Sequence, residues 1–323
     1  MHIRVPIFLA LSVLFLAQTV VALARAQSTT PPQDYVNEIM GLLRQHAITR
    51  ERVDWSELRQ KVDSLAKDAH TIEATYPAIK RAFELLDTNH TSLRTAKGQL
   101  VAYHSDLQCG EHIDRTIPKL EKVGYIRVNG FTSPDPWEKE LFAFALQRKI
   151  SEQDSADLHG WIIDLRWNTG GNMWPMIAGI GPLLGNGDYG YFINKHESRW
   201  GYLDGASVLN GKPIVTVASP YKLAYATPKI AVLSSNNTAS SGEATLISFK
   251  QRDNVRVFGK NSCGQATANR TFRLSNGSQL HLTVSEMADK DKNTYSHGVN
   301  VDEEVPQDKI IAVAVQWLKQ SGE

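Results

Sequence analysis

The sequence predicts an α/β fold that follows a small N-terminal helical bundle. Two patterns along the 323 residues lead to this prediction. Between Leu42 and Asp87 there is no glycine, and apolar residues recur at the spacing of amphipathic helices. After Gly124 the pattern changes to short apolar runs separated by turn residues and helical stretches, which is typical of alternating strands and helices. Since 42% of the residues are hydrophobic, the chain can bury one large core or two smaller ones.

The first residues carry the pattern of an export signal. A basic start is followed by an apolar run to Ala24, and the small residues Ala24 and Ala26 fit cleavage before Gln27. The run is also about as long as the ~20 residues that span a bilayer, so an uncleaved anchor is the alternative. We expect residues 1–26 to be a signal peptide or membrane anchor and 27–32 a linker. The rest is then secreted, periplasmic or held on the outer side of the inner membrane, with membrane association only through this segment.

Three amphipathic helices are expected in the N-terminal bundle, residues 33–93. The second helix has a marked start, because Asp54 and Glu57 stand at the spacing of a capping box. The third helix is expected over 71–86. Residues 94–123 then form a connecting segment that could make a small cap over a cleft.

The core is expected over residues 124–323. Its predicted strands are 125–128, 161–165, 229–234 and 255–259, and the closing helix is 307–319. A hairpin is expected to turn at Asn276-Gly277, because this dipeptide supplies the positive φ angles of two-residue hairpin loops.

Ser240 is the first candidate for chemistry. It lies between the apolar strand that ends near Ser234 and a helical stretch that starts near Ala244. A serine at a tight strand-to-helix turn exposes its hydroxyl, and the unpaired N–H groups of the helix start can stabilise an oxyanion. The alternative is structural: Ser240 caps the helix and Glu243 completes a capping box.

A second candidate segment is the buried strand that ends in Gly170-Gly171, before a helix starting near Met173. Glycines at the carboxyl end of a strand let the backbone approach a ligand. The alternatives are a tight turn or a phosphate loop. The segment lacks the Lys-Ser/Thr of a nucleotide-binding loop, which argues against nucleotide binding. A formal charge of +1 likewise argues against a nucleic-acid partner.

The third candidate is His90, in the polar segment Asp87-Thr-Asn-His90 at the exit of the bundle. It is one of ten histidines, and residues alone do not separate it from the others. The only two cysteines are Cys109 and Cys263, and export makes a disulfide between them chemically permissible. Two unpaired thiols are the alternative.

Taken in order, these segments resemble the C-terminal processing (tail-specific, tricorn-like) serine peptidase family. Its Asp-X-Arg-X-Asn-X-Gly-Gly motif matches Asp164, Arg166, Asn168, Gly170 and Gly171, and its serine turn matches Ser240 and Glu243. Its next Gly-X-X-X-X-Gly segment matches Gly259 to Gly264. The resemblance implies a core of the ClpP/crotonase-like type. It also implies that Ser240 forms an acyl-enzyme, with the oxyanion held by the amide of Ser241 and one amide of the Gly170-Gly171 turn.

The resemblance also points to the base. Family members with a Ser-Lys dyad carry lysine directly after the last glycine, where this chain has Gln265, and a neutral amide cannot accept the serine proton. Other members take a histidine from a loop before the core, which Asp87-Thr-Asn-His90 resembles. His90 is therefore the expected base, and the residues that could orient it are Asp87, Asn89 and Glu243. No cofactor or metal is required.

Within this family the chain is most similar to the nisin-resistance protein group, which also has an N-terminal hydrophobic segment, a helical bundle and a Thr-Ala-Ser-Ser turn. Residues 95–123 are too short for a peptide-binding PDZ domain. The expected substrate is a peptide or protein, cleaved near its C-terminus, or a modified antimicrobial peptide. Asn172, Met173 and Trp174 are expected to line the cleft. A non-catalytic peptide- or lipid-binding protein on the same core is the alternative.

Overall fold

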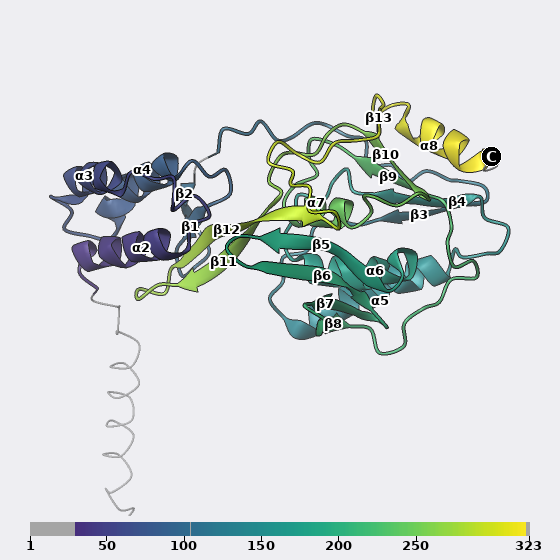
Figure 1. Ribbon diagram of the computed structural model, residues 1–323, viewed down its shortest axis with the longest axis horizontal. Coiled ribbons are helices and arrows are strands. Elements are labelled where there is room, and N and C mark those ends of the chain that lie inside the picture. The colour runs from purple at the N-terminus through teal and green to yellow at the C-terminus, as the bar shows by residue number, and fades with distance from the viewer. Residues whose placement is uncertain (1–29, 104, 321–323) are drawn as a thin grey trace, which may run out of the picture. The chain divides into compact units, whose positions relative to one another are not determined.

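The computed structural model describes residues 30–103 and 105–320 (Figure 1). The predicted signal peptide or anchor and the start of the predicted linker lie outside these residues. Over the described part of the chain, no helix is both long and apolar enough to cross a bilayer. The described residues form two compact units. One takes residues 30–103 together with Arg270–Leu282, and the other takes Ser105–Asn269 and residues 283–320.

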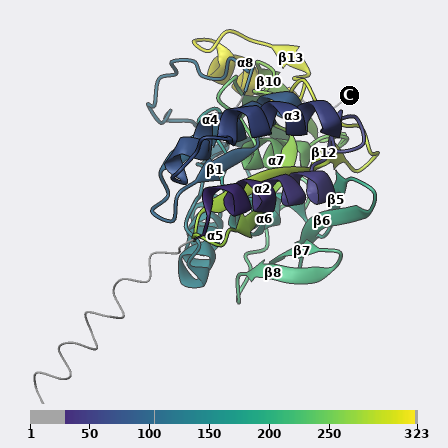
Figure 2. The ribbon, with the colours of Figure 1, turned by 90° about the vertical axis from the view of Figure 1, so that its left-hand side faces the viewer.

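The first unit contains the predicted helical bundle. Its elements are α2 (Pro32–His46), α3 (Trp55–Ala66), the 3-10 helix η2 (Glu73–Thr75) and α4 (Tyr76–Leu86), and the helices lie side by side in Figures 1 and 2. The Asp54 side chain caps α3 by accepting hydrogen bonds from the backbone N–H groups of Ser56 and Glu57. The apolar residues at helical spacing, including Leu43, Leu58 and Phe83, are buried, as the periodicity predicts.

Strands β1 (Ser92–Arg94) and β2 (Leu100–Tyr103) and parts of two further strands complete this unit. Strand β1 pairs antiparallel with β2 and with the first residues of β12 (Gln279–Asp289). Strand β11 (Thr267–Arg273) pairs with β12. The two form the predicted hairpin around Asn276-Gly277, where Gly277 has a φ of 81°. Along the chain, β11 and β12 have residues in both units.

The second unit is built on a parallel sheet of five strands. Its order is β13 (Glu303–Glu304), β10 (Val255–Gly259), β9 (Ile230–Ser234), β4 (Gly160–Asp164) and β3 (Val123–Arg127). All neighbouring pairs are parallel. Every residue of β4 and β9 is buried, because helices cover both faces, and this explains their continuous apolar runs.

Helices separate this sheet from a second one. Helix α8 (Ile310–Lys319) packs on one face, and α5 (Pro136–Ser151), α6 (Met173–Leu184) and α7 (Ser241–Ile247) belong to the core on the other face. Beyond them lies an antiparallel sheet that the sequence did not predict, made of β5 (Gly187–Ile193), β6 (Glu197–Leu203), β7 (Ala206–Leu209), β8 (Lys212–Thr216) and the end of β12. The predicted α/β fold with a helical bundle is confirmed.

The predicted cap segment is divided between the two units. Its first residues form β2 in the first unit, and residues 105–122 belong to the second unit and contain no helix or strand. We call residues 105–122 the strap.

Candidate active site

Four loops gather at the carboxyl end of the parallel sheet. They follow β3, β4, β9 and β10, and they contain respectively Phe131, Gly170, Ser240 and Gly264. In open α/β sheets this edge is where ligands bind, because the loops diverge there and leave backbone groups exposed. The fold therefore brings three of the segments singled out in the sequence to one place.

Ser240 has a strained backbone. It lies between β9 and α7 with φ 54° and ψ −116°, a conformation that L residues other than glycine rarely adopt. The side chain is half-buried, in an otherwise buried turn. A sharp strand-to-helix turn of this kind presents a serine hydroxyl ahead of the first residues of the helix.

Glu243 holds the backbone of this turn. One oxygen of its carboxylate, Oε2, accepts the Ser240 N–H at 2.7 Å, and the other, Oε1, accepts the Ser262 hydroxyl at 2.6 Å and the Gly264 N–H at 2.9 Å. The side chain is fully buried. Burial raises the pKa of Glu243 to about 7, although the hydrogen bonds from Ser262, Gly264 and Ser240 oppose the shift. The predicted capping carboxylate therefore also links α7 to the loop after β10.

The Gly170-Gly171 turn lies directly against Ser240. A Cβ atom added to Gly170 would be 2.8 Å from the Ser240 Cβ and 3.2 Å from its Oγ. The Gly170 N–H donates to the Asn168 Oδ1 at 3.0 Å, and the Asn168 carbonyl accepts the Ala239 N–H at 3.0 Å. Asn168 thus fixes both sides of the contact between the glycine turn and the serine turn.

The N–H of Gly171 is oriented differently from that of Gly170. The Phe131 N–H donates to the Gly170 carbonyl at 3.2 Å, and the Phe131 carbonyl accepts the Asn172 N–H at 2.6 Å. In such a parallel bridge the groups on either side of Gly171 face Phe131, so the Gly171 N–H points away from it. The Gly171 carbonyl accepts the Ser241 hydroxyl at 2.6 Å. Within residues 30–103 and 105–320, neither the Gly171 N–H nor the Ser241 N–H has a hydrogen-bond acceptor, so both remain free to bind a ligand.

The charged residues of the glycine motif form a buried structural pair. Arg166 donates to both carboxylate oxygens of Asp164, at 2.9 and 2.7 Å, and Tyr125 donates to Oδ2 at 2.7 Å. Burial, together with the neighbouring Asp164 carboxylate, raises the pKa of Tyr125. These contacts hold both side chains in place at the end of β4, and they fix the start of the loop that carries Gly170.

The expected cleft residues separate into two kinds. Asn172 caps α6 by accepting the Trp174 N–H at 3.1 Å. Met173 packs in the core and is only 5% exposed, which removes it from a cleft lining. Trp174 is partly buried against the same core, with its ring 6.3 Å from that of Phe192.

His90 and its predicted neighbours belong to the first unit. His90 is half-buried in the turn between α4 and β1. Asp87 ends α4 in a left-handed conformation with φ 51°, and the Asn89 carbonyl accepts the Tyr103 hydroxyl at 3.1 Å. Ser240, Ser241, Gly170, Gly171 and Glu243 all belong to the second unit.

Several residues that shape the second-unit site were not singled out in the sequence as functional. Ser262 holds Glu243, and Gly242 leaves no room for a side chain, since a Cβ there would be 2.3 Å from the Asn168 carbonyl oxygen. No periodic pattern in the sequence marks Ser262 or Gly242.

The disulfide that the sequence allowed is formed. Cys109 and Cys263 are joined with a Cα–Cα distance of 5.3 Å.

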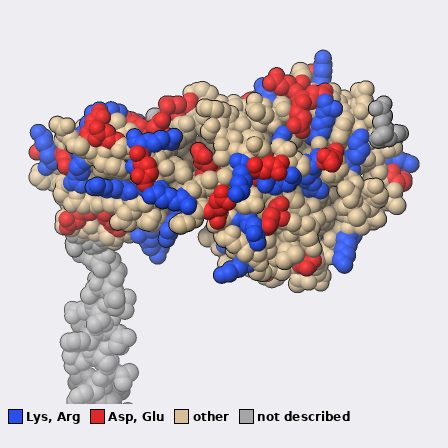
Figure 3. All heavy atoms as spheres, in the orientation of Figure 1, with Lys and Arg blue, Asp and Glu red and all other residues tan. Residues whose placement is uncertain are grey.

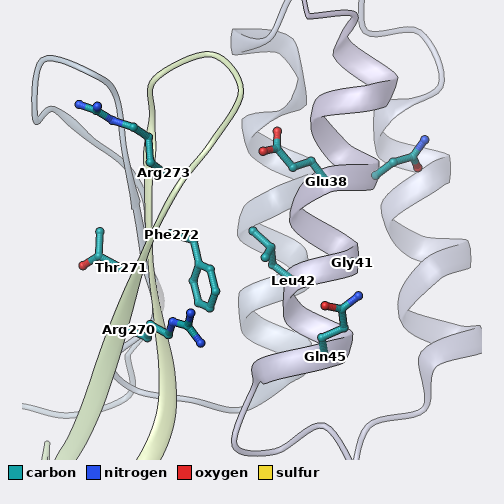
Figure 4. A pocket seen from close by; sticks show the side chains of 9 residues that line it. Glu38, Gly41, Leu42, Gln45, Arg270, Thr271, Phe272 and Arg273 are labelled. Atoms are coloured by element: carbon teal, nitrogen blue, oxygen red, sulfur yellow. The ribbon is translucent and has the colours of Figure 1, made fainter.

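The first unit has a groove between α2 and β11, where Leu42 and Phe272 face each other and Arg270 and Arg273 extend from the strand (Figure 4). Acidic and basic side chains alternate over the face drawn in Figure 3, which shows no patch of a single sign. Among the described residues, no group of three or more His, Cys, Asp and Glu side chains is placed to hold a metal.

The fold and the sequence of the second unit are those of a peptidase family. The chain belongs to peptidase family S41, whose sequence pattern matches residues 122–305, more than half of its length. The family resemblance predicted from the motifs is confirmed.

Particular relatives extend the comparison beyond the core. The chain is 26% identical over 292 residues to the nisin-resistance protein of Lactococcus lactis subsp. lactis, covering 89% of this chain and 87% of that protein. Its fold is similar to that of a lipoprotein from Streptococcus agalactiae, with a TM-score of 0.73, 22% identity and coverage of 90% of this chain and 96% of that one. It is also similar to the photosystem II D1 C-terminal processing protease, with a TM-score of 0.52, 15% identity and coverage of 86% and 93%. At these identities, the similarity to the two solved structures is a similarity of fold alone.

Proposed function

We propose that this chain is an exported serine peptidase with Ser240 as its nucleophile. The observation that carries the proposal is the strained backbone of Ser240, φ 54° and ψ −116°, in a turn that Glu243 and Asn168 hold by hydrogen bonds. Strain of this kind costs about 1–3 kcal/mol, so it persists where the surrounding structure enforces it, and it is concentrated at functional sites. A residue that only capped the helix would not need it.

The oxyanion site is assigned to two backbone N–H groups, those of Ser241 and Gly171. Of the two glycines expected to contribute, Gly170 already donates its N–H to Asn168, which leaves that of Gly171. Two preorganised donors stabilise the charge that develops on the carbonyl oxygen when Ser240 attacks. Losing one such donor typically lowers the rate by ~10²–10³.

His90 is proposed as the general base, on the resemblance of its loop to that of histidine-type family members. A neutral imidazole would take the proton of the Ser240 hydroxyl during attack and return it to the leaving amine, and water would then hydrolyse the acyl-enzyme. Two observations argue against a lysine as the general base. Gln265 follows Gly264, and the nearby Lys260 is bound to the Glu111 carboxylate at 2.6 Å. Asp87 and Asn89 are proposed to orient His90.

The proposed substrate is a peptide or protein chain. Similarity to a protein named for nisin resistance favours an antimicrobial peptide, and similarity of fold to a C-terminal processing protease favours cleavage near a C-terminus. Asn172 and Trp174 remain the proposed cleft residues. Export is proposed from the N-terminal apolar segment, which would be removed or would serve as the anchor.

The decisive experiment is labelling with a fluorophosphonate, which modifies an activated serine. We expect one label on the purified wild-type protein, at Ser240, and none on Ser240→Ala. Ser155→Ala is the matched control and should be labelled at the wild-type rate, because Ser155 is an exposed serine in the loop between α5 and β4. His90→Gln should reduce the labelling rate by ~10²–10⁴, the usual contribution of a general base. Absence of label on wild type, or equal label on Ser240→Ala, would refute the assignment and favour a binding protein.

A further inference from the structure

The disulfide Cys109–Cys263 joins two segments that are far apart in the chain, with a separation of 154 residues. Cys109 lies in the strap and is exposed, whereas Cys263 lies in the loop after β10 and is only 6% exposed. Cys109 is therefore the more accessible of the two residues to a reagent in solution, and Cys263 is buried beside the serine turn.

The residues on either side of Cys263 hold the nucleophile turn. Ser262 and Gly264 both donate to the Glu243 Oε1, and the Glu243 Oε2 accepts the Ser240 N–H. Cys263 itself donates its N–H to the Thr238 carbonyl at 2.8 Å. Three consecutive residues of one loop thus bind the serine turn on both sides of Ala239.

The residues after Cys109 bind the same turn from the strap. The Gly110 N–H donates to the Asn236 Oδ1 and the Glu111 N–H donates to the Asn237 Oδ1, each at 2.8 Å. The Asn237 side-chain N–H donates back to the Glu111 carbonyl at 2.8 Å. The strap has no helix or strand of its own, so side-chain and backbone contacts of this kind hold it in place. Besides these bonds and the disulfide, the Glu111 carboxylate contacts Lys260 at 2.6 Å and accepts from Gln307 at 3.3 Å.

We propose that Cys109 and Cys263 are positioning residues of the active site, and that peptidase activity depends on their disulfide being formed. The proposal rests on the proposed function, because it concerns the same serine. With the disulfide broken, the strap and the loop after β10 are no longer tied together, and the contacts of Ser262 and Gly264 with Glu243 loosen. Ser240 then loses the fixed geometry on which attack depends, and a misplacement of ~1 Å can lower a rate by ~10².

The chemical step is an ordinary thiol–disulfide exchange with a dithiol reductant. One thiolate of the reductant attacks the exposed sulfur of Cys109, and Cys263 leaves as a thiolate that takes up a proton. The second thiol of the reductant then displaces Cys109, so that the protein gains two thiols and the reductant becomes a cyclic disulfide. An oxidised dithiol reverses the reaction.

The test compares the oxidised protein, the dithiol-reduced protein and the double variant Cys109→Ala, Cys263→Ala. Circular dichroism confirms that each form is folded at the assay temperature. We expect reduction to lower kcat and the rate of fluorophosphonate labelling of Ser240 by about tenfold or more, with KM changed less than about twofold. Reoxidation should restore both rates. The double variant should have the kcat and labelling rate of the reduced protein, and adding the reductant should change neither.

Hydrogen–deuterium exchange supplies a readout that does not need activity. Reduction should raise exchange over residues 236–243 and leave β3 and β4 unchanged. If the reduced and folded protein keeps its kcat, its labelling rate and its protection, the positioning proposal is wrong and the proposed function stands. If the oxidised protein is never labelled at Ser240, the proposed function fails, and the exchange data alone decide whether the disulfide orders the turn.

Discussion

Replacing Gly170 by alanine tests the contact between the glycine turn and Ser240. Gly170 has a φ of 103°, and an added Cβ would be 2.8 Å from the Ser240 Cβ, 3.0 Å from the Ala239 carbonyl oxygen and 3.2 Å from the Ser240 Oγ. Ordinary carbon–carbon contacts are about 3.5–4.0 Å, so the two Cβ atoms would overlap by ~0.7 Å. Neither is at the end of a flexible side chain, so one of the two turns must move.

Two effects of Gly170→Ala can be separated by size. The positive φ costs an alanine about 1–2 kcal/mol, and overpacking a buried site typically costs about 1–3 kcal/mol more. The free energy of unfolding should therefore fall by about 2–5 kcal/mol. The new methyl group lies beside the nucleophile, and displacing that nucleophile by up to ~1 Å should lower kcat by ~10–100-fold.

Gly211→Ala is the matched control. Gly211 also has a positive φ, 76°, and it follows β7 in a turn where an added Cβ would meet nothing within 4 Å. This variant should lose about 1–2 kcal/mol and keep kcat within about twofold. The assays are denaturant unfolding, peptide hydrolysis and fluorophosphonate labelling, at a temperature where all forms are folded. A folded Gly170→Ala protein with wild-type kcat would show that the contact does not position Ser240.

Three further changes probe other parts of the structure. Folding raises the pKa of Glu243 from 4.5 to about 7, so between these pH values the native state keeps a proton that the unfolded state releases. The free energy of unfolding of the wild type should therefore fall by up to about 3 kcal/mol as pH rises through this window. The melting temperature of Glu243→Gln should not show this fall with pH. Tyr125→Phe removes a hydrogen bond to the buried Asp164 carboxylate and should lower the free energy of unfolding by about 1.5–3 kcal/mol, seen as a lower denaturant midpoint with an unchanged m value. Asp54→Ala removes the cap of α3 and should cost about 1 kcal/mol in denaturant unfolding while leaving kcat unchanged, and a large fall in kcat would contradict this.

The elements that the sequence predicted well are those with a strong period or a continuous apolar run. The helices of the first unit bury one face each, and strands β3, β4, β9 and β10 are buried on both faces, so their patterns are clear. Strands β5 to β8 were missed because their residues are mixed. β8 has three exposed residues at its start, one of them Pro213, and β5 contains two glycines and is only partly buried. Neither pattern alternates cleanly.

The sequence motifs pointed to several residues that meet at the candidate site, and they did not indicate the interactions between them. The motif around Asp164 and Arg166 marks the loop, but the buried ion pair that makes the loop rigid depends on Tyr125, which lies 39 positions before Asp164. The sequence offers Glu243 as a local cap or as a residue that orients His90, whereas two of its partners, Ser262 and Gly264, come from the loop after another strand. Hydrogen bonds between loops that meet only in the folded sheet leave no periodic trace in a sequence.

The discontinuity of the first unit has a consequence for the order in which the protein is made. Strand β1 pairs with residues of β12, and Leu93 is opposite Leu280, so this sheet lacks one strand until the ribosome has synthesised nearly all of the second unit's sheets. At about 5–20 residues per second, the bundle waits on the order of ten seconds or more for that strand. Under the proposed export, the nascent chain would therefore meet the translocation machinery with its N-terminal unit still incomplete.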